Sequence, residues 1–263
     1  MSMSLEGRTA IVTGGSTLVG HGVVTALHAA GAHVVVADID REGGEAIVAK
    51  LGHGASFLST DITVDKDLQK LVEETADAHG GIDVVVNLAC TYLDNGFATA
   101  RQDWLAALDV NVVSAVAMVQ AAHPHLVCSK HAAVVNISSI SSKVAQTGRW
   151  VYPVSKAAIV QLTRSMALDL ASDGIRVNSV SPGWTWSKIM DNLSEGDRRK
   201  TDEVAAPFHL THRVGDPIEV GNVVAFLVSD SASVVTGADW AADGGYSALG
   251  PEQTVPAIPL LSA

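Results

Sequence analysis

Short apolar segments alternate with helix-length segments along most of this chain, and that alternation constrains the fold more than any other feature. Apolar, β-branched runs predict strands at residues 8–13, 33–38, 55–60, 83–87, 132–137, 176–181 and 239–241. Helices are predicted between them at residues 19–30, 41–51, 64–79, 101–124, 151–172 and 217–228, the last beginning with Asp216-Pro217. Such alternation is typical of βαβ units, in which helical crossovers join parallel strands.

The predicted strands are apolar at nearly every position, with no regular change between apolar and polar residues. Strands that are covered on both faces have this composition, so a parallel sheet is expected. The predicted fold is therefore α/β: a doubly wound (Rossmann) parallel sheet of about seven strands with helices on both faces. We assign residues 1–263 to a single domain, because no low-complexity linker or repeat divides them.

Two segments depart from this pattern. Residues 184–215 carry aromatic side chains and charges without a clear period, and we interpret them as a lid over the substrate. Residues 246–263 follow the last predicted strand as a Pro-containing tail. Because ligands of doubly wound sheets bind at the carboxyl ends of the strands, functional residues are expected at that edge.

Charge and cysteine content exclude several classes of function. A net charge of −11 argues against nucleic acid and anionic membranes as partners. The two cysteines, Cys90 and Cys128, have no metal-ligand or disulfide spacing, so no metal site is predicted and a reducing compartment is expected. The N-terminus lacks a signal-peptide pattern, and the longest apolar runs fall short of the roughly 20 residues of a membrane span. We therefore expect a cytoplasmic protein.

A glycine-containing turn joins the first predicted strand to the first helix. In Thr13-Gly14-Gly15-Ser16-Thr17-Leu18-Val19-Gly20, backbone N–H groups can face a pyrophosphate at the helix N-terminus. Asp38 ends the second strand, where a carboxylate can accept hydrogen bonds from the adenosine ribose and repel a 2′-phosphate, so NAD is favoured over NADP. The alternatives are an ordinary strand–helix turn and a turn-forming Asp.

Tyr152 and Lys156 lie four residues apart and share one face of a predicted helix. The Lys ammonium can lower the pKa of the phenol, which can then act as a general acid or base on an alcohol or ketone oxygen. Ser139, thirteen residues before the Tyr at the end of a strand, can hold that same oxygen. Without Ser139 and the glycine turn, the pair would be interpreted as an ordinary surface Tyr and Lys.

Taken together, these residues resemble the short-chain dehydrogenase/reductase family over roughly residues 5–245. Thr13-Gly14-x-x-x-Leu18-x-Gly20 is similar to the cofactor loop of the family, with Leu18 in place of its middle glycine. Asn87-Leu88-Ala89-Cys90 stands where the family has Asn-Asn-Ala-Gly, and Asp243-Gly244-Gly245 resembles its closing motif. The resemblance implies catalytic roles for Asn111, Ser139, Tyr152 and Lys156. It also implies cofactor contacts by Gly14, Ser16, Thr17, Leu18, Val19, Asp38, Asp61, Ile62, Asn87, Ala89, Tyr152, Lys156, Pro182, Gly183, Thr185 and Ser187.

The expected function is an NAD-dependent oxidoreductase that interconverts a secondary alcohol and a ketone on a small-molecule substrate. Trp150, Trp184, Trp186 and Phe208 favour an apolar, cyclic or aromatic substrate, unless they pack the lid or an interface between subunits. The family resemblance also implies a homotetramer. Two alternatives stay open, a 3-oxoacyl thioester reductase and a non-catalytic dinucleotide-binding protein.

Overall fold

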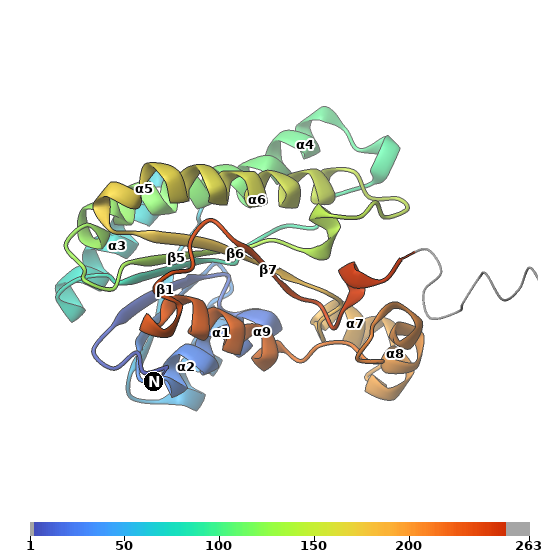
Figure 1. Ribbon diagram of the computed structural model, residues 1–263, viewed down its shortest axis with the longest axis horizontal. Helices are drawn as coiled ribbons and strands as arrows, with labels where there is room; N and C mark the ends of the chain where they lie inside the picture. Colours follow the sequence, from blue (N-terminus) through green and yellow to red (C-terminus); the bar gives the residue numbers. More distant parts are fainter. Residues whose placement is uncertain (1–2, 251–263) are drawn as a thin grey trace, which may run out of the picture.

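A parallel sheet forms the centre of the computed structural model, which describes residues 3–250 (Figure 1). Its strands are β1 (Thr9–Thr13), β2 (His33–Asp38), β3 (Ala55–Ser59), β4 (Val84–Asn87), β5 (Ala133–Ile137), β6 (Arg176–Pro182) and β7 (Asp239–Ala242). They lie in the order β3-β2-β1-β4-β5-β6-β7, and all neighbours pair in parallel. The direction of the strand order reverses between β1 and β4, and this position is the topological switch point of the sheet.

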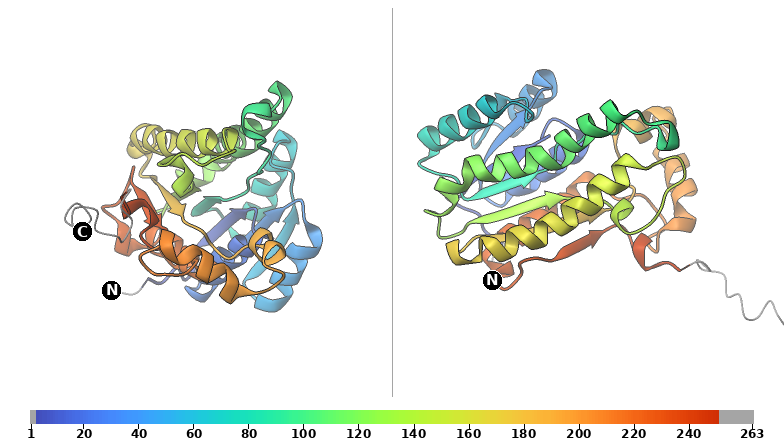
Figure 2. Two further views of the ribbon diagram at one scale, coloured as in Figure 1. Left: turned by 90° about the vertical axis from the view of Figure 1, so that its right-hand side faces the viewer. Right: turned by 90° about the horizontal axis from the view of Figure 1, so that it is seen from above.

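Helices cover both faces of the sheet (Figures 1 and 2). One face carries α1 (Leu18–Ala29), α2 (Arg41–Leu51) and α9 (Pro217–Val228). The other carries α3 (Asp65–His79), α4 (Arg101–Leu108), α5 (Ser114–Leu126) and α6 (Val151–Asp169). Two short helices, α7 (Lys188–Leu193) and α8 (Arg198–Ala205), lie together at one end of the molecule. The doubly wound α/β fold expected from the sequence is confirmed.

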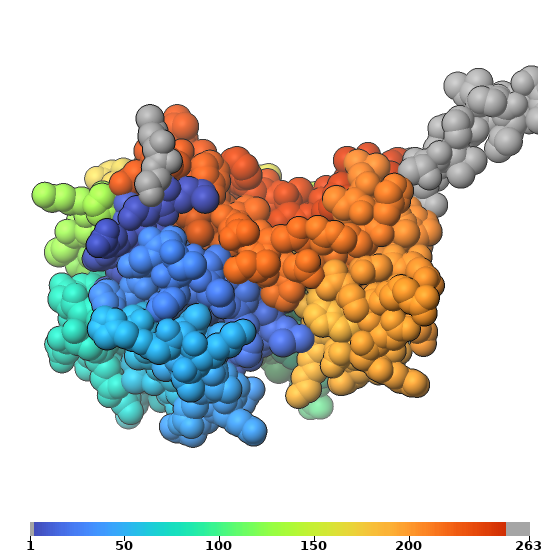
Figure 3. Space-filling view, turned by 90° about the horizontal axis from the view of Figure 1, so that it is seen from below, coloured from blue at the N-terminus to red at the C-terminus, as the bar shows by residue number. Residues whose placement is uncertain are grey.

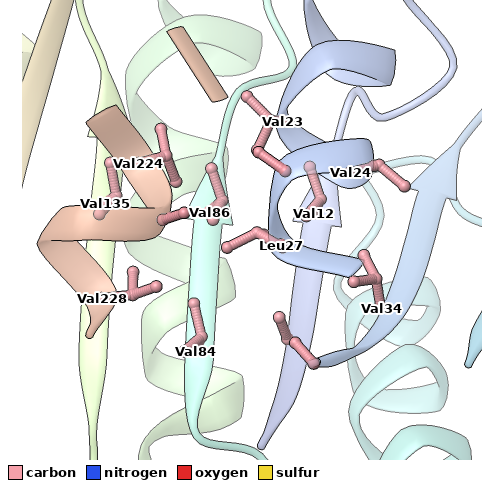
Figure 4. Close-up of a cluster of buried hydrophobic side chains, with 14 of the residues drawn as sticks. Val12, Val23, Val24, Leu27, Val34, Val84, Val86, Val135, Val224 and Val228 are labelled. Atoms are coloured by element: carbon pink, nitrogen blue, oxygen red, sulfur yellow. The ribbon is translucent and has the colours of Figure 1, made fainter. Parts of the chain in front are cut away.

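Strands β1 to β6 each contribute side chains to two hydrophobic cores, which explains their nearly continuous apolar composition. Figure 4 shows Val12, Val84 and Val86 of neighbouring strands facing Leu27 of α1 and Val224 of α9. The residues next to them along the strands point to the opposite core, against α3, α5 and α6. Full burial of one such side chain stabilises the fold by about 1.5–3 kcal/mol.

Helices α1 and α9 approach each other closely at two glycines. A Cβ atom on Gly22 would lie 2.2 Å from the carbonyl group of Pro217, and one on Gly221 would lie 2.3 Å from the carbonyl oxygen of Gly22. Neither position has room for a side chain. The contact holds the N-terminal half of α1, which follows the glycine turn, against the start of α9.

Residues 101–126 form a continuous helical stretch that contains a π-helical turn over Asp109–Val113 between α4 and α5. By length and composition alone this stretch could cross a membrane, with a mean hydropathy of 1.7 over its most apolar 18 residues. In the structure it lies in the same layer as α3 and α6, and it buries Asn111 within the protein. These features are typical of a core helix in a sheet protein.

The predicted strands agree with the observed ones to within one residue at each end. Helix α9 begins as predicted, with Pro217 as its first residue and the Glu219 carboxylate accepting a hydrogen bond from the Asp216 N–H at 2.7 Å. Helices α7 and α8 were not predicted within the segment 184–215. Of the predicted tail, residues 251–263 lie outside the described part of the chain.

Candidate active site

The predicted site residues meet at the carboxyl ends of β1, β4 and β5, next to the switch point of the sheet. A small cavity there is lined by Thr13, Ile62, Asn87, Ala89, Val110, Asn111, Ser114, Ala115, Ile137, Lys156 and Ile159. Four of these residues, Ile62, Asn87, Ala89 and Asn111, were expected on the basis of the family resemblance, and Lys156 was expected from its spacing to Tyr152 as well. The cavity therefore brings the predicted cofactor and catalytic residues together.

The glycine turn after β1 leaves no room for side chains. Gly14 has a φ of +71°, and a Cβ atom there would lie 2.6 Å from the backbone of Ala89. A Cβ atom on Gly20 would lie 2.3 Å from the carbonyl oxygen of Gly14. Thr17 caps α1 by accepting a hydrogen bond from the Gly20 N–H at 3.0 Å. Close packing on Ala89 and within the turn therefore requires these glycines, and the turn leads into a helix N-terminus, where a pyrophosphate can bind.

Leu18 and Val19, the first residues of α1, have different surroundings. Leu18 occupies the position where the family has a glycine, and its side chain is 36% exposed, so it stays clear of the core. Val19 is partly buried and packs against the core shared by α1 and α9. The substitution of Leu for Gly therefore adds apolar surface beside the cofactor turn without disturbing the packing of α1.

Asp38, the last residue of β2, is held to the glycine turn by hydrogen bonds. Its carboxylate accepts hydrogen bonds from the N–H groups of Ser16 and Asp40, both at 3.0 Å. The Ser16 hydroxyl donates to the carbonyl oxygen of Asp40 at 2.9 Å, which completes the link. The guanidinium group of Arg41, the nearest cation in the sequence, pairs with Glu45 at 3.1 Å.

Asp61 follows β3 at the edge of the sheet, and Asn87 is the last residue of β4, which lies next to β1. The hydroxyl and N–H groups of Thr63 donate to the Asp61 carboxylate at 2.7 and 3.0 Å, and these hydrogen bonds lower the pKa of Asp61. The Asn87 amide donates to Asn136 on β5 at 2.9 Å, and the Asn136 amide donates to Thr163 on α6 at 3.0 Å. This buried chain of amides ties β4, β5 and α6 together.

The four residues predicted to be catalytic come from three neighbouring elements. Tyr152 and Lys156 lie in the first turns of α6, Ser139 follows β5, and Asn111 lies in the π-helical turn. The ammonium of Lys156 lies 5.6 Å from the centroid of the Tyr152 ring and donates to the carbonyl oxygen of Ile137 at 2.8 Å.

Both Asn111 and Ser139 are held by hydrogen bonds within the protein. The Asn111 amide accepts from the Thr91 N–H at 2.7 Å and donates to the Ser155 hydroxyl at 3.1 Å. The Ser139 hydroxyl oxygen accepts from the Ser141 N–H at 3.1 Å, and the Ser141 hydroxyl donates to the Gln146 side chain at 2.7 Å. Ser141 and Gln146 were missed in the sequence because polar residues after a strand are common in ordinary turns.

Burial dominates the ionisation of Tyr152. It raises the pKa of the Tyr152 phenol well above its usual value, the neighbouring Tyr92 and Cys90 raise it further, and a hydrogen bond with Ser139 lowers it. In the protein alone, burial therefore outweighs the lowering of the phenol pKa expected from Lys156, and the effect of Lys156 itself stays a prediction. The Lys156 ammonium is engaged by a backbone carbonyl.

The predicted nicotinamide-side residues run from the end of β6 into the lid. A Cβ atom on Gly183, which follows Pro182, would lie 2.8 Å from Asp243, so only glycine fits. Thr185 is buried and donates to the carbonyl oxygen of Gly183 at 3.3 Å. Ser187 begins α7 as its N-cap residue. Their positions agree with the order expected from the family, and their contacts with a cofactor stay a prediction.

Several of the predicted substrate-facing aromatic residues pack within the lid, which consists of residues 184–215 and forms one end of the molecule (Figure 3). The ring centroids of Trp184 and Phe208 lie 5.5 Å apart, and the Phe208 ring stacks on Tyr246 at 6.5 Å. Trp186 lies beneath the Arg198 guanidinium at 5.2 Å. Trp150 is half exposed and lies beside Tyr152 in the chain. Lid packing therefore accounts for Trp184 and Phe208.

Comparisons with known proteins show what the whole chain is similar to. A family model described as enoyl-(acyl carrier protein) reductase matches residues 16–247. L-fucose dehydrogenase of Mus musculus is 34% identical over 244 residues, which cover 91% of this chain and 88% of that protein. A 2,5-dichloro-2,5-cyclohexadiene-1,4-diol dehydrogenase of Sphingobium indicum is 34% identical over 249 residues, covering 93% and 99%. A solved structure described as "Crystal structure of gox2181" superposes with a TM-score of 0.85 at 31% identity, covering 94% and 98%.

Proposed function

The chain belongs to the short-chain dehydrogenase/reductase family, and on that premise we propose that it is an NAD-dependent oxidoreductase that interconverts a secondary alcohol and a ketone. Its dehydrogenase relatives place it among oxidoreductases of the alcohol dehydrogenase type. One observation carries the proposal: Ser139, Tyr152 and Lys156 lie at the edge of the sheet at which the glycine turn leads into α1. Asn111 and Lys156 line one cavity there together with Thr13 and Ala89.

In the oxidising direction, the Tyr152 phenolate removes the proton from the substrate hydroxyl group, and the Ser139 hydroxyl holds the substrate oxygen. Lys156 supplies a fixed positive charge one helical turn from Tyr152, which opposes the effect of burial on the phenol. Asn111, held by Thr91 and Ser155, can position a water molecule that carries the proton to solvent. When NAD is bound, its nicotinamide ring supplies the hydride chemistry.

The preference for NAD rests on the negative charge at the end of β2. Asp38 is held there by two backbone N–H groups, and its carboxylate oxygens can also accept from ribose hydroxyl groups. Asp40 places a second carboxylate two residues later, whereas the Arg41 guanidinium is paired with Glu45. A 2′-phosphate would therefore meet two carboxylates and no free guanidinium at this position.

The proposed substrate is a small ring compound that carries a secondary hydroxyl group. One relative is named for a sugar and another for a chlorinated cyclic diol. Both of these compounds carry hydroxyl groups. A 3-oxoacyl thioester reductase is the second candidate, and the matching family model is also described by an enzyme that acts on an acyl thioester. Asp38 argues against this candidate, since 3-oxoacyl thioester reductases of the family usually use NADPH.

Steady-state oxidation of a panel of ring alcohols, including L-fucose, cyclohexane-1,2-diol and 1-phenylethanol, tests the proposal through NADH absorbance. We expect NAD⁺ to be preferred over NADP⁺ by at least about tenfold in kcat/KM, which corresponds to roughly 1.4 kcal/mol. Asp38→Ala should reduce that preference, whereas the matched control Asp65→Ala on α3 should leave it unchanged. Equal efficiency of the wild type with NADP⁺ would contradict the cofactor assignment, and turnover of acyl thioesters alone would favour the second candidate.

A further inference from the structure

The helix that carries Tyr152 and Lys156 begins without a capping side chain of its own. Trp150 occupies the N-cap position of α6 and makes no side-chain capping bond. The third residue of the helix is Pro153, which has no N–H group. The N–H groups that do exist in this first turn have no acceptor within the helix, so they need one from another part of the chain.

Asp94, in the loop that follows β4, provides this acceptor. Its carboxylate oxygens lie 3.0 and 2.9 Å from the Trp150 nitrogen and 2.9 Å from the Tyr152 nitrogen, and both N–H groups donate to it. The same carboxylate accepts from the Gly96 N–H at 3.0 Å within its own loop. Burial raises the pKa of Asp94, but these backbone hydrogen bonds outweigh it and lower the pKa overall. A carboxylate is also the group that the positive end of a helix dipole favours.

The rest of the loop lies along residues 148–152. The rings of Tyr92 and Tyr152 stack with centroids 4.8 Å apart and planes at 24°. The edge of Phe97 faces Trp150 at 5.7 Å, and Gly96 lies against the backbone of Gly148. Asp94 therefore lies at the centre of the contact between its loop and residues 148–152, the segment that ends with Tyr152.

We infer that Asp94 is a positioning residue, which holds the backbone of Tyr152 so that its phenol stands at the distance needed for proton transfer. This inference rests on the proposed function. Among the contacts that hold α6, Lys156 donates to the Ile137 carbonyl at 2.8 Å, and Asp94 accepts from the N–H groups at the start of the helix. A shift of about 1 Å at a reacting group can reduce a rate about a hundredfold, so loss of the contact with Asp94 should be visible in catalysis.

Asp94→Ala and Asp94→Asn test the inference, with Asp83→Ala and Asp83→Asn as matched controls. The Asp83 carboxylate also accepts a backbone N–H across the chain, from Thr9 at 2.8 Å, but at the opposite end of β4. We expect Asp94→Ala to lower kcat by about ten- to a hundredfold, with KM and the Kd for NADH within about twofold of wild type. Asp94→Asn should retain more activity, because its amide oxygen can still accept hydrogen bonds from the N–H groups of Trp150 and Tyr152. The Asp83 variants should have a lower Tm than the wild type, but the same kcat per folded molecule.

Hydrogen exchange of the peptide that contains residues 149–155 provides a readout that needs no substrate. Asp94→Ala should accelerate exchange at Trp150 and Tyr152, and Asp83→Ala should not. Unchanged exchange in this peptide, or a loss of Tm in Asp94→Ala with wild-type kcat, would overturn the positioning role. Absence of turnover by the wild type would contradict the proposed function alone, since the exchange experiment would still decide whether Asp94 holds Tyr152.

Discussion

At the scale of single residues, Tyr152 carries the proton transfer of the proposed reaction, and its surroundings oppose its ionisation. Burial raises the pKa of this phenol well above the value of a free tyrosine, so the free protein holds it protonated at neutral pH. A protonated phenol suits the reduction of a ketone, in which Tyr152 donates the proton. Oxidation of an alcohol needs the phenolate and is therefore expected to accelerate as the pH rises.

This ionisation predicts opposite pH responses for the two directions of the reaction. The kcat/KM for alcohol oxidation should rise from pH 6 to 9, and that for ketone reduction should not rise over the same range. Tyr152→Phe should lower kcat at least about a hundredfold in both directions and remove the rise, because no ionisable phenol remains. NADH fluorescence titration should give a Kd close to wild type.

Tyr246→Phe is the control for Tyr152→Phe, since Tyr246 lies against the lid and outside the catalytic set. It should keep the pH dependence of the wild type. A Tyr152→Phe protein that retained more than about a tenth of wild-type kcat would assign the acid–base role to another group.

Sequence spacing predicted Tyr152, Lys156 and Ser139 because the chemistry requires a phenol, an ammonium and a hydroxyl group at fixed intervals. Asp94 could not be found in this way, since the residues it binds lie 56 and 58 positions away. The direction in which the pKa of Tyr152 is shifted could not be predicted from the sequence either, because it depends on how completely the fold removes water from the phenol.

At the scale of secondary structure, elements that bury two apolar faces were predicted well, and those stabilised by polar contacts were missed. Helix α8 has a polar sequence and depends on Asp197, whose side chain caps it, and on Arg198, which pairs with Asp202 and Asp216. Such contacts leave no apolar period to detect. The π-helical turn that buries Asn111 was also missed, because residues 101–124 were predicted as one uninterrupted helix.

The contact between α1 and α9 gives a prediction about how these elements support the cofactor turn. Gly22→Ala should lower the free energy of unfolding by about 1–3 kcal/mol, because the added methyl group would lie within 2.2 Å of the Pro217 carbonyl group and would force the helices apart. The shift should move α1 and raise the Kd for NADH. Denaturant titration and fluorescence titration would measure the two effects.

The control for Gly22→Ala is Glu73→Ala on the exposed face of α3, which changes helix propensity without changing a contact between helices. It should keep both the unfolding free energy and the Kd near wild type. A Gly22→Ala protein as stable as the wild type would show that α9 can move away from α1 without cost.

At the scale of the whole molecule, the number of strands and the two helical layers could be predicted, because the βα order fixes the handedness of each crossover. The oligomeric assembly could not be predicted, since contacts between subunits leave no periodic pattern in the sequence. Apolar side chains remain exposed on the outer helices and near β7, with Leu105 63%, Leu168 78% and Val234 91% exposed. Single exposed apolar side chains are also common on monomeric proteins, so the expected homotetramer stays a prediction.

The segment 250–263 belongs to the same question of assembly. It carries Val255, Ile258, Leu260 and Leu261 between prolines, a composition unlike that of typical disordered ends. Prolines restrict the unbound chain and so reduce the entropy lost when a segment is held on a surface. We predict that this segment contacts a neighbouring subunit. Its deletion should therefore lower the number of subunits per particle, as measured by light scattering, or raise KM for the substrate. The affinity for NADH should stay unchanged. Replacing the four apolar residues by Ser at full length should have the same effect as the deletion if apolar contact is the cause. An unchanged number of subunits and an unchanged KM in the truncated protein would contradict a role for the segment in assembly.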